Sequence, residues 1–295
     1  MKNNKFAILI LNFNGLRDTI ECINSILKSN YRVYDVFCLD NNSKNNEFAK
    51  LNNKFKKNKK INIIKSNKNL GFAGGNNCLA SKVKLNNYDC LLLLNNDTIV
   101  KEDFLSEMNK GINETKDDKI VVFSPTIYYF NNDLKKEKIW RGNKYNKLSN
   151  KNERINHLVG CAFFIKSKIV KKYGLFNENF FAYGEELEYF YRLRKKRFIF
   201  YYIPRSVIWH KVVEHKDSKL KIYMVARNKW YYWNLMDKWD KLWYSFYFLF
   251  IDRFIKLTTL FLHFKKLKIY LKGNLDGLKW IITNKKPKNP FIEDE

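Results

Sequence analysis

Short hydrophobic runs alternate with segments of helical periodicity along the first hundred residues. Four of these runs are too short for buried helices and end in polar residues, as expected of strands that are covered on both faces. They occupy residues 6–11, 34–39, 61–64 and 90–94. Because a helical segment separates each run from the next, the strands can pair in parallel, and we predict an α/β fold with a doubly wound parallel sheet.

The fourth run leads directly into Asn95, Asn96 and Asp97. In an open parallel sheet, ligands bind beyond the carboxyl ends of the strands, so the Asp97 carboxylate is expected to face a binding site. A simple Asn/Asp turn after a strand explains the same residues. This segment alone does not decide between the two interpretations.

A glycine-rich segment, residues 69–77, follows the third run and precedes a helix. Its spacing does not match the dinucleotide-binding fingerprint. Glycine lets a backbone approach a ligand closely, and a helix N-terminus offers free amides to an anion. An anionic ligand and an ordinary helix start therefore explain the segment equally well.

Three more apolar runs, at 120–129, 158–165 and 199–203, predict later strands. The lysine-rich stretch between the first two contains Trp140 and is expected to form a surface loop or a hairpin. The sheet is therefore expected to extend well beyond the first hundred residues.

Acidic residues cluster at Glu185, Glu186 and Glu188, in a chain otherwise dominated by lysine. Aromatic residues flank the cluster, which indicates a semi-enclosed pocket where a carboxylate with a raised pKa acts as a base. The alternative is that the acids complement the dipole at a helix N-terminus.

Composition narrows the class of partner. With 295 residues, of which 45% are hydrophobic, the chain can bury a large core and is not a disordered chain. Its formal net charge of +27 favours an anionic partner: nucleic acid, lipid headgroups or a phosphorylated substrate. Residues 189–289 hold 24 Lys and Arg against 6 Asp and Glu, so the charge is concentrated toward the C-terminus.

The C-terminal part is also rich in aromatic residues, with five of the seven tryptophans after residue 228. Its apolar stretch 244–251 is interrupted by Asp252 and is shorter than a membrane-spanning helix requires. A helix lying in the interface of an anionic membrane fits this pattern, and an aromatic helical subdomain that packs on itself is the alternative. We therefore expect an α/β domain at 1–228 and a membrane-associating helical region at 229–295.

The five cysteines are scattered and odd in number, which is typical of reduced, mostly buried thiols in a cytosolic protein. The N-terminus leads into the first strand without a signal-peptide pattern. We therefore expect a cytoplasmic protein that is peripheral on the inner face of the cell membrane.

Seven motifs in this order and spacing resemble the inverting GT-A-fold glycosyltransferases of family 2, most closely the rhamnosyltransferase-like branch. The resemblance covers roughly residues 6–228. Its motifs are Ile-Leu-Asn-Phe-Asn-Gly, Leu-Asp-Asn-Asn-Ser, Asn-Leu-Gly-Phe-Ala-Gly-Gly-Asn-Asn, Leu-Asn-Asn-Asp, Tyr-Gly-Glu-Glu, Trp-His and Ala-Arg-Asn.

The resemblance implies a set of residues around a nucleotide-sugar donor. The backbone near Leu11 and Phe13 would cradle the nucleotide, and Asp40 would contact its base or ribose. The remaining donor-site residues would be Gly71, Gly74, Asn77 and Asn96.

The Asn-Asn-Asp segment resembles the family's DxD-type motif, in which only the last acid is kept. Asp97 would then bind Mg²⁺ or Mn²⁺ across the donor diphosphate, and His210 resembles the histidine that completes the coordination. A structural histidine after a strand is the alternative for His210.

Glu186 stands where the family usually has the aspartate that removes the proton of the acceptor hydroxyl. Glutamate is one methylene longer, and Glu188 also stands where an acid recurs, so the sequence departs from the family pattern here. Glu185 would orient the acceptor or cap the helix.

These expectations amount to an inverting hexosyltransferase of cell-envelope polysaccharide biosynthesis. It would move a sugar, with rhamnose favoured by the resemblance, from a nucleotide-diphosphate donor to a lipid-linked or polysaccharide acceptor. A catalytically inactive glycan-binding relative is one alternative. A basic nucleic-acid-binding protein is the other, although no nucleic-acid-binding motif is recognisable and we expect no nucleic-acid partner.

Overall fold

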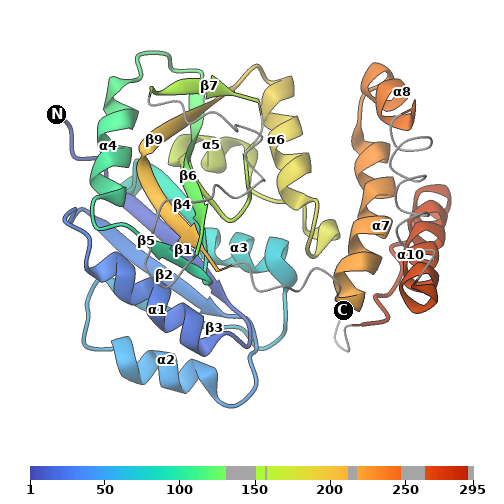
Figure 1. Cartoon of the computed structure of the whole chain (residues 1–295), viewed down its shortest axis with the longest axis horizontal. Helices are drawn as coiled ribbons and strands as arrows, with labels where there is room; N and C mark the ends of the chain where they lie inside the picture. Colours follow the sequence, from blue (N-terminus) through green and yellow to red (C-terminus); the bar gives the residue numbers. More distant parts are fainter. Residues whose placement is uncertain (131–150, 157, 212–217, 247–262, 292–295) are drawn as a thin grey trace. The chain divides into compact units, whose positions relative to one another are not determined.

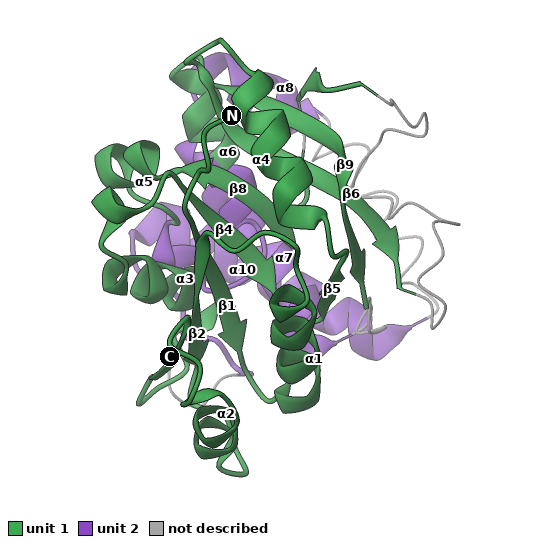
Figure 2. Cartoon of the chain, turned by 90° about the vertical axis from the view of Figure 1, so that its left-hand side faces the viewer, with its two compact units in different colours: residues 1–176, 190–213 green, residues 177–189, 214–295 purple. Residues whose placement is uncertain are grey.

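A computed structural model describes residues 1–130, 151–156, 158–211, 218–246 and 263–291. The chain forms two compact units, shown in Figure 2. The first unit comprises residues 1–176 and 190–213, and the second comprises 177–189 and 214–295. The boundary expected at residue 228 falls inside a helix, α7 (Lys219–Leu235), which the structure places as a whole in the second unit.

Four parallel strands form the first half of the sheet, in the order β3-β2-β1-β4 (Figure 1). They are β1 (Phe6–Asn12), β2 (Tyr34–Asp40), β3 (Ile61–Lys65) and β4 (Cys90–Asn95). The connecting helices are α1 (Leu16–Leu27), α2 (Glu47–Phe55) and α3 (Gly71–Lys82). The parallel sheet predicted for the first hundred residues is therefore confirmed.

The sheet continues beyond β4 with strands of both directions, in the order β8-β6-β9-β5. Strand β8 (Ala162–Lys166) is antiparallel to β4 and to β6 (Ile120–Tyr129), which runs parallel to β9 (Ile199–His210). Strands β5 (Thr98–Val100) and β7 (Glu153–Ile155) both pair antiparallel with β9. The three later strands predicted are present, and the stretch around Trp140 lies outside the described residues.

Strand β9 passes through Pro204 and is longer than the apolar run that predicts it. Proline has no amide hydrogen to donate to the ladder. The pairing with β6 therefore shifts register, from Pro125 opposite Ile203 to Thr126 opposite Val207. The Thr126 hydroxyl donates to the Pro204 carbonyl at 2.9 Å, and the strand continues to His210.

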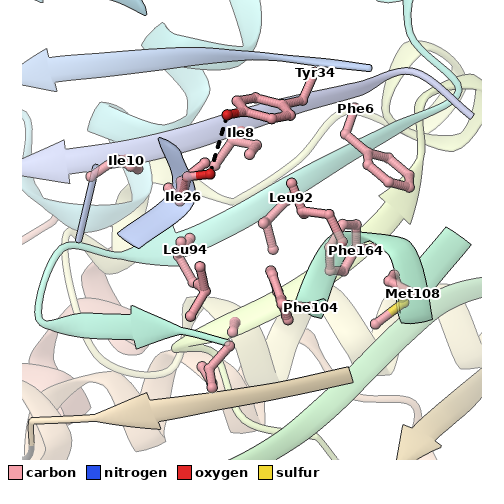
Figure 3. Close-up of a cluster of buried hydrophobic side chains, with 14 of the residues drawn as sticks. Phe6, Ile8, Ile10, Ile26, Tyr34, Leu92, Leu94, Phe104, Met108 and Phe164 are labelled. Atoms are coloured by element: carbon pink, nitrogen blue, oxygen red, sulfur yellow. Dashed lines mark hydrogen bonds between the residues drawn. The ribbon is translucent and has the colours of Figure 1, made fainter. Parts of the chain in front are cut away.

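The side chains of β1 alternate between the two faces of the sheet. Phe6, Ile8 and Ile10 are buried in one cluster with Ile26 of α1 and Phe104, the first residue of α4 (Phe104–Glu114) (Figure 3). The Tyr34 hydroxyl, drawn in the same view, donates to the Ile26 carbonyl at 3.1 Å. Helices α1 and α4 therefore cover one face of the strands that carry the candidate site.

Helix α3 lies against the opposite face of β1. A Cβ atom on Gly75 would lie 2.5 Å from a methyl carbon of Leu11, which is closer than side chains approach one another. Glycine at this position therefore allows helix and strand to meet. Two shorter helices, α5 (Ser167–Tyr173) and α6 (Glu185–Lys195), complete the α/β part of the chain.

The C-terminal part of the second unit is helical in its described residues. Its helices are α7, α8 (Lys238–Phe246) and α10 (Phe264–Thr283). Helix α10 packs closely on α7, because Cβ atoms on Gly273 and Gly277 would each lie 2.6 Å from a carbonyl oxygen of α7. Helix α8 is tied to α7 where the Trp233 indole donates to the Ser245 hydroxyl at 2.8 Å.

Candidate active site

The register of the parallel strands brings polar residues to one edge of the sheet. Asn12 pairs with Asp40, and Leu11 pairs with Asn95. The Asn12 side chain is buried and its amide nitrogen lies 2.8 Å from the Asp40 carboxylate and 3.0 Å from the Glu47 carboxylate. This asparagine therefore joins the ends of β1 and β2 to the start of α2.

A chain of hydrogen bonds links this cluster to the end of β4. The Asn96 side-chain amide donates to the Thr19 hydroxyl at 2.9 Å, and that hydroxyl donates to the side-chain oxygen Oδ1 of Asn12 at 2.6 Å. Gly15 leaves room for the Asn96 side-chain amide, because a Cβ atom at Gly15 would lie 2.6 Å from the Asn96 nitrogen. The Asn96 side chain thus supports the turn that carries Asp97.

Asp40 was expected to touch the nucleotide, and the structure places it inside the protein. It is 1% exposed, and its second carboxylate oxygen accepts from the Ser43 amide at 3.2 Å. Ser43 in turn accepts from the Asn14 amide at 2.9 Å. The geometry therefore supports a role for Asp40 in fixing the two loops at this edge, with Phe13 standing exposed beside them.

Asp97 and His210 lie together at this edge. Strand β5 pairs with the end of β9, so that Thr98 is opposite His210. The Asp97 Oδ1 and His210 Nε2 atoms are 3.1 Å apart, and the Lys211 amide donates to the Asp97 carbonyl at 2.8 Å. The Asp97 side chain is 25% exposed and that of His210 is 9% exposed. A carboxylate and an imidazole therefore converge at an edge that a ligand can reach.

The pair fits a divalent metal that a substrate helps to hold. Carboxylate and imidazole both ligate Mn²⁺, and Mg²⁺ or Mn²⁺ bound to diphosphates takes few protein ligands, with phosphate oxygens and waters completing the shell. Among the described residues, no cluster of three or more His, Cys, Asp or Glu could enclose a metal. Asp97 and His210 therefore suit a metal that a diphosphate helps to hold.

The glycine-rich segment is held by asparagines. The Asn41 carbonyl oxygen accepts from the Leu70 amide at 2.9 Å, and its amide donates to the Gly71 carbonyl at 3.1 Å. Gly71 has a φ of 70°, a conformation that favours glycine. Gly74 is buried within α3. The segment is thus a fixed loop and helix start at the same edge of the sheet.

Asn77 holds a neighbouring loop. Its amide donates to the Phe176 carbonyl at 2.9 Å, and its carbonyl oxygen accepts from the Phe176 amide at 3.0 Å. This two-way contact fixes the chain just after α5. Both polar atoms of the side chain therefore bind backbone, which supports a positioning role.

The loop before Glu185 has an unusual backbone. Phe181 has φ 61° and ψ −63°, and the Ala182 amide donates to the Phe180 carbonyl at 2.7 Å, which defines a γ-turn. Tyr183 and Gly184 also have positive φ values, 65° and 105°. Three such residues in a row of four indicate a strained loop, and strain of this kind persists only where other contacts impose it.

Asn228 makes those contacts. Its amide nitrogen lies 3.0 Å from the Phe180 carbonyl oxygen, 2.8 Å from that of Ala182 and 2.7 Å from that of Tyr183. The neighbouring Arg227 is fully buried and also donates to the Phe180 carbonyl, at 3.3 Å. The Ala-Arg-Asn motif therefore clamps the loop, a role that the sequence did not reveal.

The two acids after this loop differ in environment. Burial, and then repulsion from Glu186, raise the pKa of the Glu185 carboxyl well above its usual value. Glu186 is only partly buried and accepts from the Gly184 amide at 3.3 Å. Glu188 is buried one turn further on. Burial thus favours the neutral form of the Glu185 carboxyl, next to the more exposed carboxyl of Glu186.

The structure thus places Leu11, Phe13, Asp40, Gly71, Asn96, Asp97 and His210 at one edge of the first unit's sheet. Glu185 and Glu186 belong to the second unit. The sequence analysis did not identify Thr19, Asn41, Glu47 or Asn228. Asn41 and Asn228 lie inside motifs of the family resemblance, and this position was the sequence feature that could have identified them.

Comparison with known proteins bears on the family and the fold of the chain. A family model described as "Glycosyl transferase family 2" matches residues 7–174. No curated protein matches the chain. Several solved structures do.

One similar structure is TarS 1-349 of S. aureus in complex with UDP-GlcNAc, with a TM-score of 0.65 and 12% identity over 91% of this chain and 79% of that one. Another is GalNAc-T7 with UDP, GalNAc and Mn²⁺, with a TM-score of 0.62 and 16% identity over 79% of this chain and 50% of that one. The mannosyltransferase PcManGT from Pyrobaculum calidifontis, in complex with GDP-Man and Mn²⁺, has a TM-score of 0.61 and 10% identity over 79% of this chain and 64% of that one. This chain thus spans half of GalNAc-T7 and under two thirds of PcManGT, and at such identities the likeness concerns the fold.

Proposed function

Because the chain belongs to glycosyl transferase family 2 and has the GT-A fold of its structural neighbours, we propose that it transfers a sugar from a nucleoside-diphosphate donor to a lipid-linked or polysaccharide acceptor, with inversion at the anomeric carbon. One observation carries the proposal. Asp97 and His210 meet at 3.1 Å at the carboxyl edge of a parallel sheet, where such folds bind ligands.

On the donor side, Asp97 and His210 hold Mg²⁺ or Mn²⁺. A bound divalent ion neutralises the charge that develops on the leaving diphosphate. The exposed Phe13 ring and the backbone near Leu11 receive the nucleotide. Asp40, Asn77 and Asn96 keep the surrounding loops in place through the hydrogen bonds described above.

On the acceptor side, Glu186 removes the proton of the attacking hydroxyl. A base must be ionised before it can accept a proton, and Glu186 is the more exposed member of its pair. The raised pKa of Glu185 favours its protonated form, and in that form the carboxyl can donate a hydrogen bond to the acceptor. The strained loop held by Asn228 positions both carboxyl groups at the start of α6.

The donor remains to be identified by experiment. The motif resemblance favours dTDP-rhamnose, whereas the structural neighbours hold UDP, UDP-GlcNAc or GDP-Man. Thermal unfolding should therefore be measured with a panel of nucleoside diphosphates and their sugars, with and without Mn²⁺. A ligand at 100 times its Kd stabilises the folded state by about 2.7 kcal/mol.

We expect at least one nucleotide to raise the Tm of the wild type in a Mn²⁺-dependent way. Asp97→Asn should abolish the shift, and Asp118→Asn should keep it, because Asp118 is an almost fully exposed aspartate of the same unit. NMR of the product then reports the anomeric configuration. If no nucleotide stabilises the protein under any metal condition, the inactive-relative alternative replaces the enzyme.

A further inference from the structure

Helix α8 presents a stripe of large apolar side chains to solvent. Trp239 is 72% exposed, Leu242 63%, Trp243 76% and Phe246 60%. Leu242, Trp243 and Phe246 follow Trp239 by three, four and seven residues, which places all four on one face of the helix. The opposite face holds α8 on α7, through Tyr244 against Tyr232 and the Ser245 hydroxyl. Tyr244 and Ser245 lie outside the exposed stripe. Most of the expected interfacial stretch 244–251 lies outside the described residues.

Helix α10 has a second exposed stripe. Phe264, Leu271, Leu275 and Ile282 are between 45% and 70% exposed. They lie on the side away from Gly273 and Gly277, which meet α7. Lysines border this stripe at positions 265, 268, 272 and 279. An exposed apolar face bordered by lysines is typical of helices that lie in a membrane interface.

We propose that the exposed faces of α8 and α10, defined by these eight apolar residues, bind the surface of an anionic lipid bilayer. Tryptophan and phenylalanine rings settle at the level of the headgroups, and lysines reach lipid phosphates. No helix in the described part of the chain is both long enough and apolar enough to span a bilayer.

Charge favours a bilayer over a second copy of the chain. Residues 218–246 and 263–291 contain 14 Lys and Arg against 3 Asp and Glu. A symmetric contact between two such faces would bring like charges together, whereas an anionic surface complements them. The proposal goes beyond sugar transfer and does not depend on it, because neither stripe includes a residue of the candidate active site.

The test is co-sedimentation of the full chain with vesicles of phosphatidylcholine alone and with added phosphatidylglycerol. The variants are Trp239→Ala/Trp243→Ala on α8 and Lys268→Glu/Lys272→Glu/Lys279→Glu on α10. The charge-matched control is Lys54→Glu/Lys57→Glu/Lys59→Glu at the end of α2, in the other unit. Circular dichroism and the nucleotide-dependent Tm shift show that each variant is folded.

We expect the wild type and the α2 control to bind the anionic vesicles and to bind neutral vesicles at least about tenfold more weakly. Each α8 or α10 variant should lose about tenfold or more in partitioning, and added salt should weaken wild-type binding. Equal binding of the folded tryptophan variant would overturn the proposal. So would a wild-type dimer in solution that the tryptophan variant converts to a monomer while vesicle binding is unchanged.

Discussion

The two regions that carry the candidate acids are built in different ways. Asp97 and His210 meet because strands β5 and β9 pair in register, and neither residue has a positive φ. Glu185 and Glu186 follow a γ-turn at Phe181 and positive φ values at Tyr183 and Gly184, and the two non-glycine residues cost of order 1–3 kcal/mol each. One region is fixed by a β-ladder, and the other by the side chain of Asn228 from a distant helix. Substitutions should therefore affect them differently.

The largest effect is expected for Glu186→Gln, which removes the proposed base and keeps the size of the side chain. Turnover should fall by about 100-fold to 10,000-fold, because that is the usual contribution of a positioned base. The Mn²⁺-dependent Tm shift with nucleotide should stay as in the wild type, since the donor ligands are untouched. Steady-state transfer assays measure the fall in turnover, and thermal unfolding measures the Tm shift. A variant that keeps full turnover would assign the base to another group.

A smaller effect on turnover, with a loss of stability, is expected for Asn228→Ala. The substitution removes the side-chain donor that three carbonyl groups share, although that of Phe180 keeps the Ala182 amide and Arg227 as donors. The free energy of unfolding should therefore fall by about 2 kcal/mol. The loop should relax from its strained form, and a displaced carboxylate should lower kcat by about 10-fold to 100-fold. Urea unfolding and transfer assays measure both.

Asn274→Ala provides the matched control for that substitution. Asn274 is also a buried asparagine of the second unit, where it accepts from the Trp230 indole and donates to the Tyr270 carbonyl. The Asn274→Ala variant should lose a similar amount of free energy of unfolding and keep the kcat of the wild type. If the two variants lose equal activity, Asn228 contributes to folding alone and the loop does not depend on it.

The strand ends that carry Asp97 could be predicted from the sequence, whereas the contact of Asn228 with the loop before Glu185 could not. Hydrophobic runs place the ends of β1, β2 and β4 at one edge, so Asp97 follows from local pattern alone. His210 came from the family resemblance, because its pairing with β5 joins segments far apart in the chain. The positive φ values of Phe181 and Tyr183 run against local preference for such side chains. No residue near them in the sequence predicts the turn, because the side chain that stabilises it, Asn228, is on α7.

A pH-dependent effect is expected for Glu185→Gln. The pKa of this carboxyl is raised in the folded state by burial and by Glu186, so the folded protein holds a proton that the unfolded chain releases above pH 4.5. Stability of the wild type therefore falls as the pH rises above 4.5 toward the raised pKa. The glutamine variant lacks this loss and should be more stable than the wild type at pH 7, with little difference at pH 4. Unfolding curves measured between pH 4 and pH 7 test this pH dependence. A difference in stability between wild type and variant that did not change with pH would mean that Glu185 is ionised in the folded protein.

The smallest effect is expected for Lys211→Met, beside Asp97 and His210, the proposed metal-binding pair. The Lys211 ammonium contacts Asp18 at 2.8 Å and also pairs with Glu21, which ties β9 to α1. Both acids are about one-third exposed, so the substitution should lower the free energy of unfolding by only about 1 kcal/mol. Hydrogen bonds from Lys211 and then Arg17 lower the pKa of Glu21. The stability difference between wild type and variant should therefore be present at pH 7 and shrink as the pH falls below 4.5 through that lowered pKa. Because the ladder and the Lys211 backbone fix Asp97 and His210, the Mn²⁺-dependent nucleotide shift should be unchanged, and its loss would show that side chains, not strand register, hold this pair together.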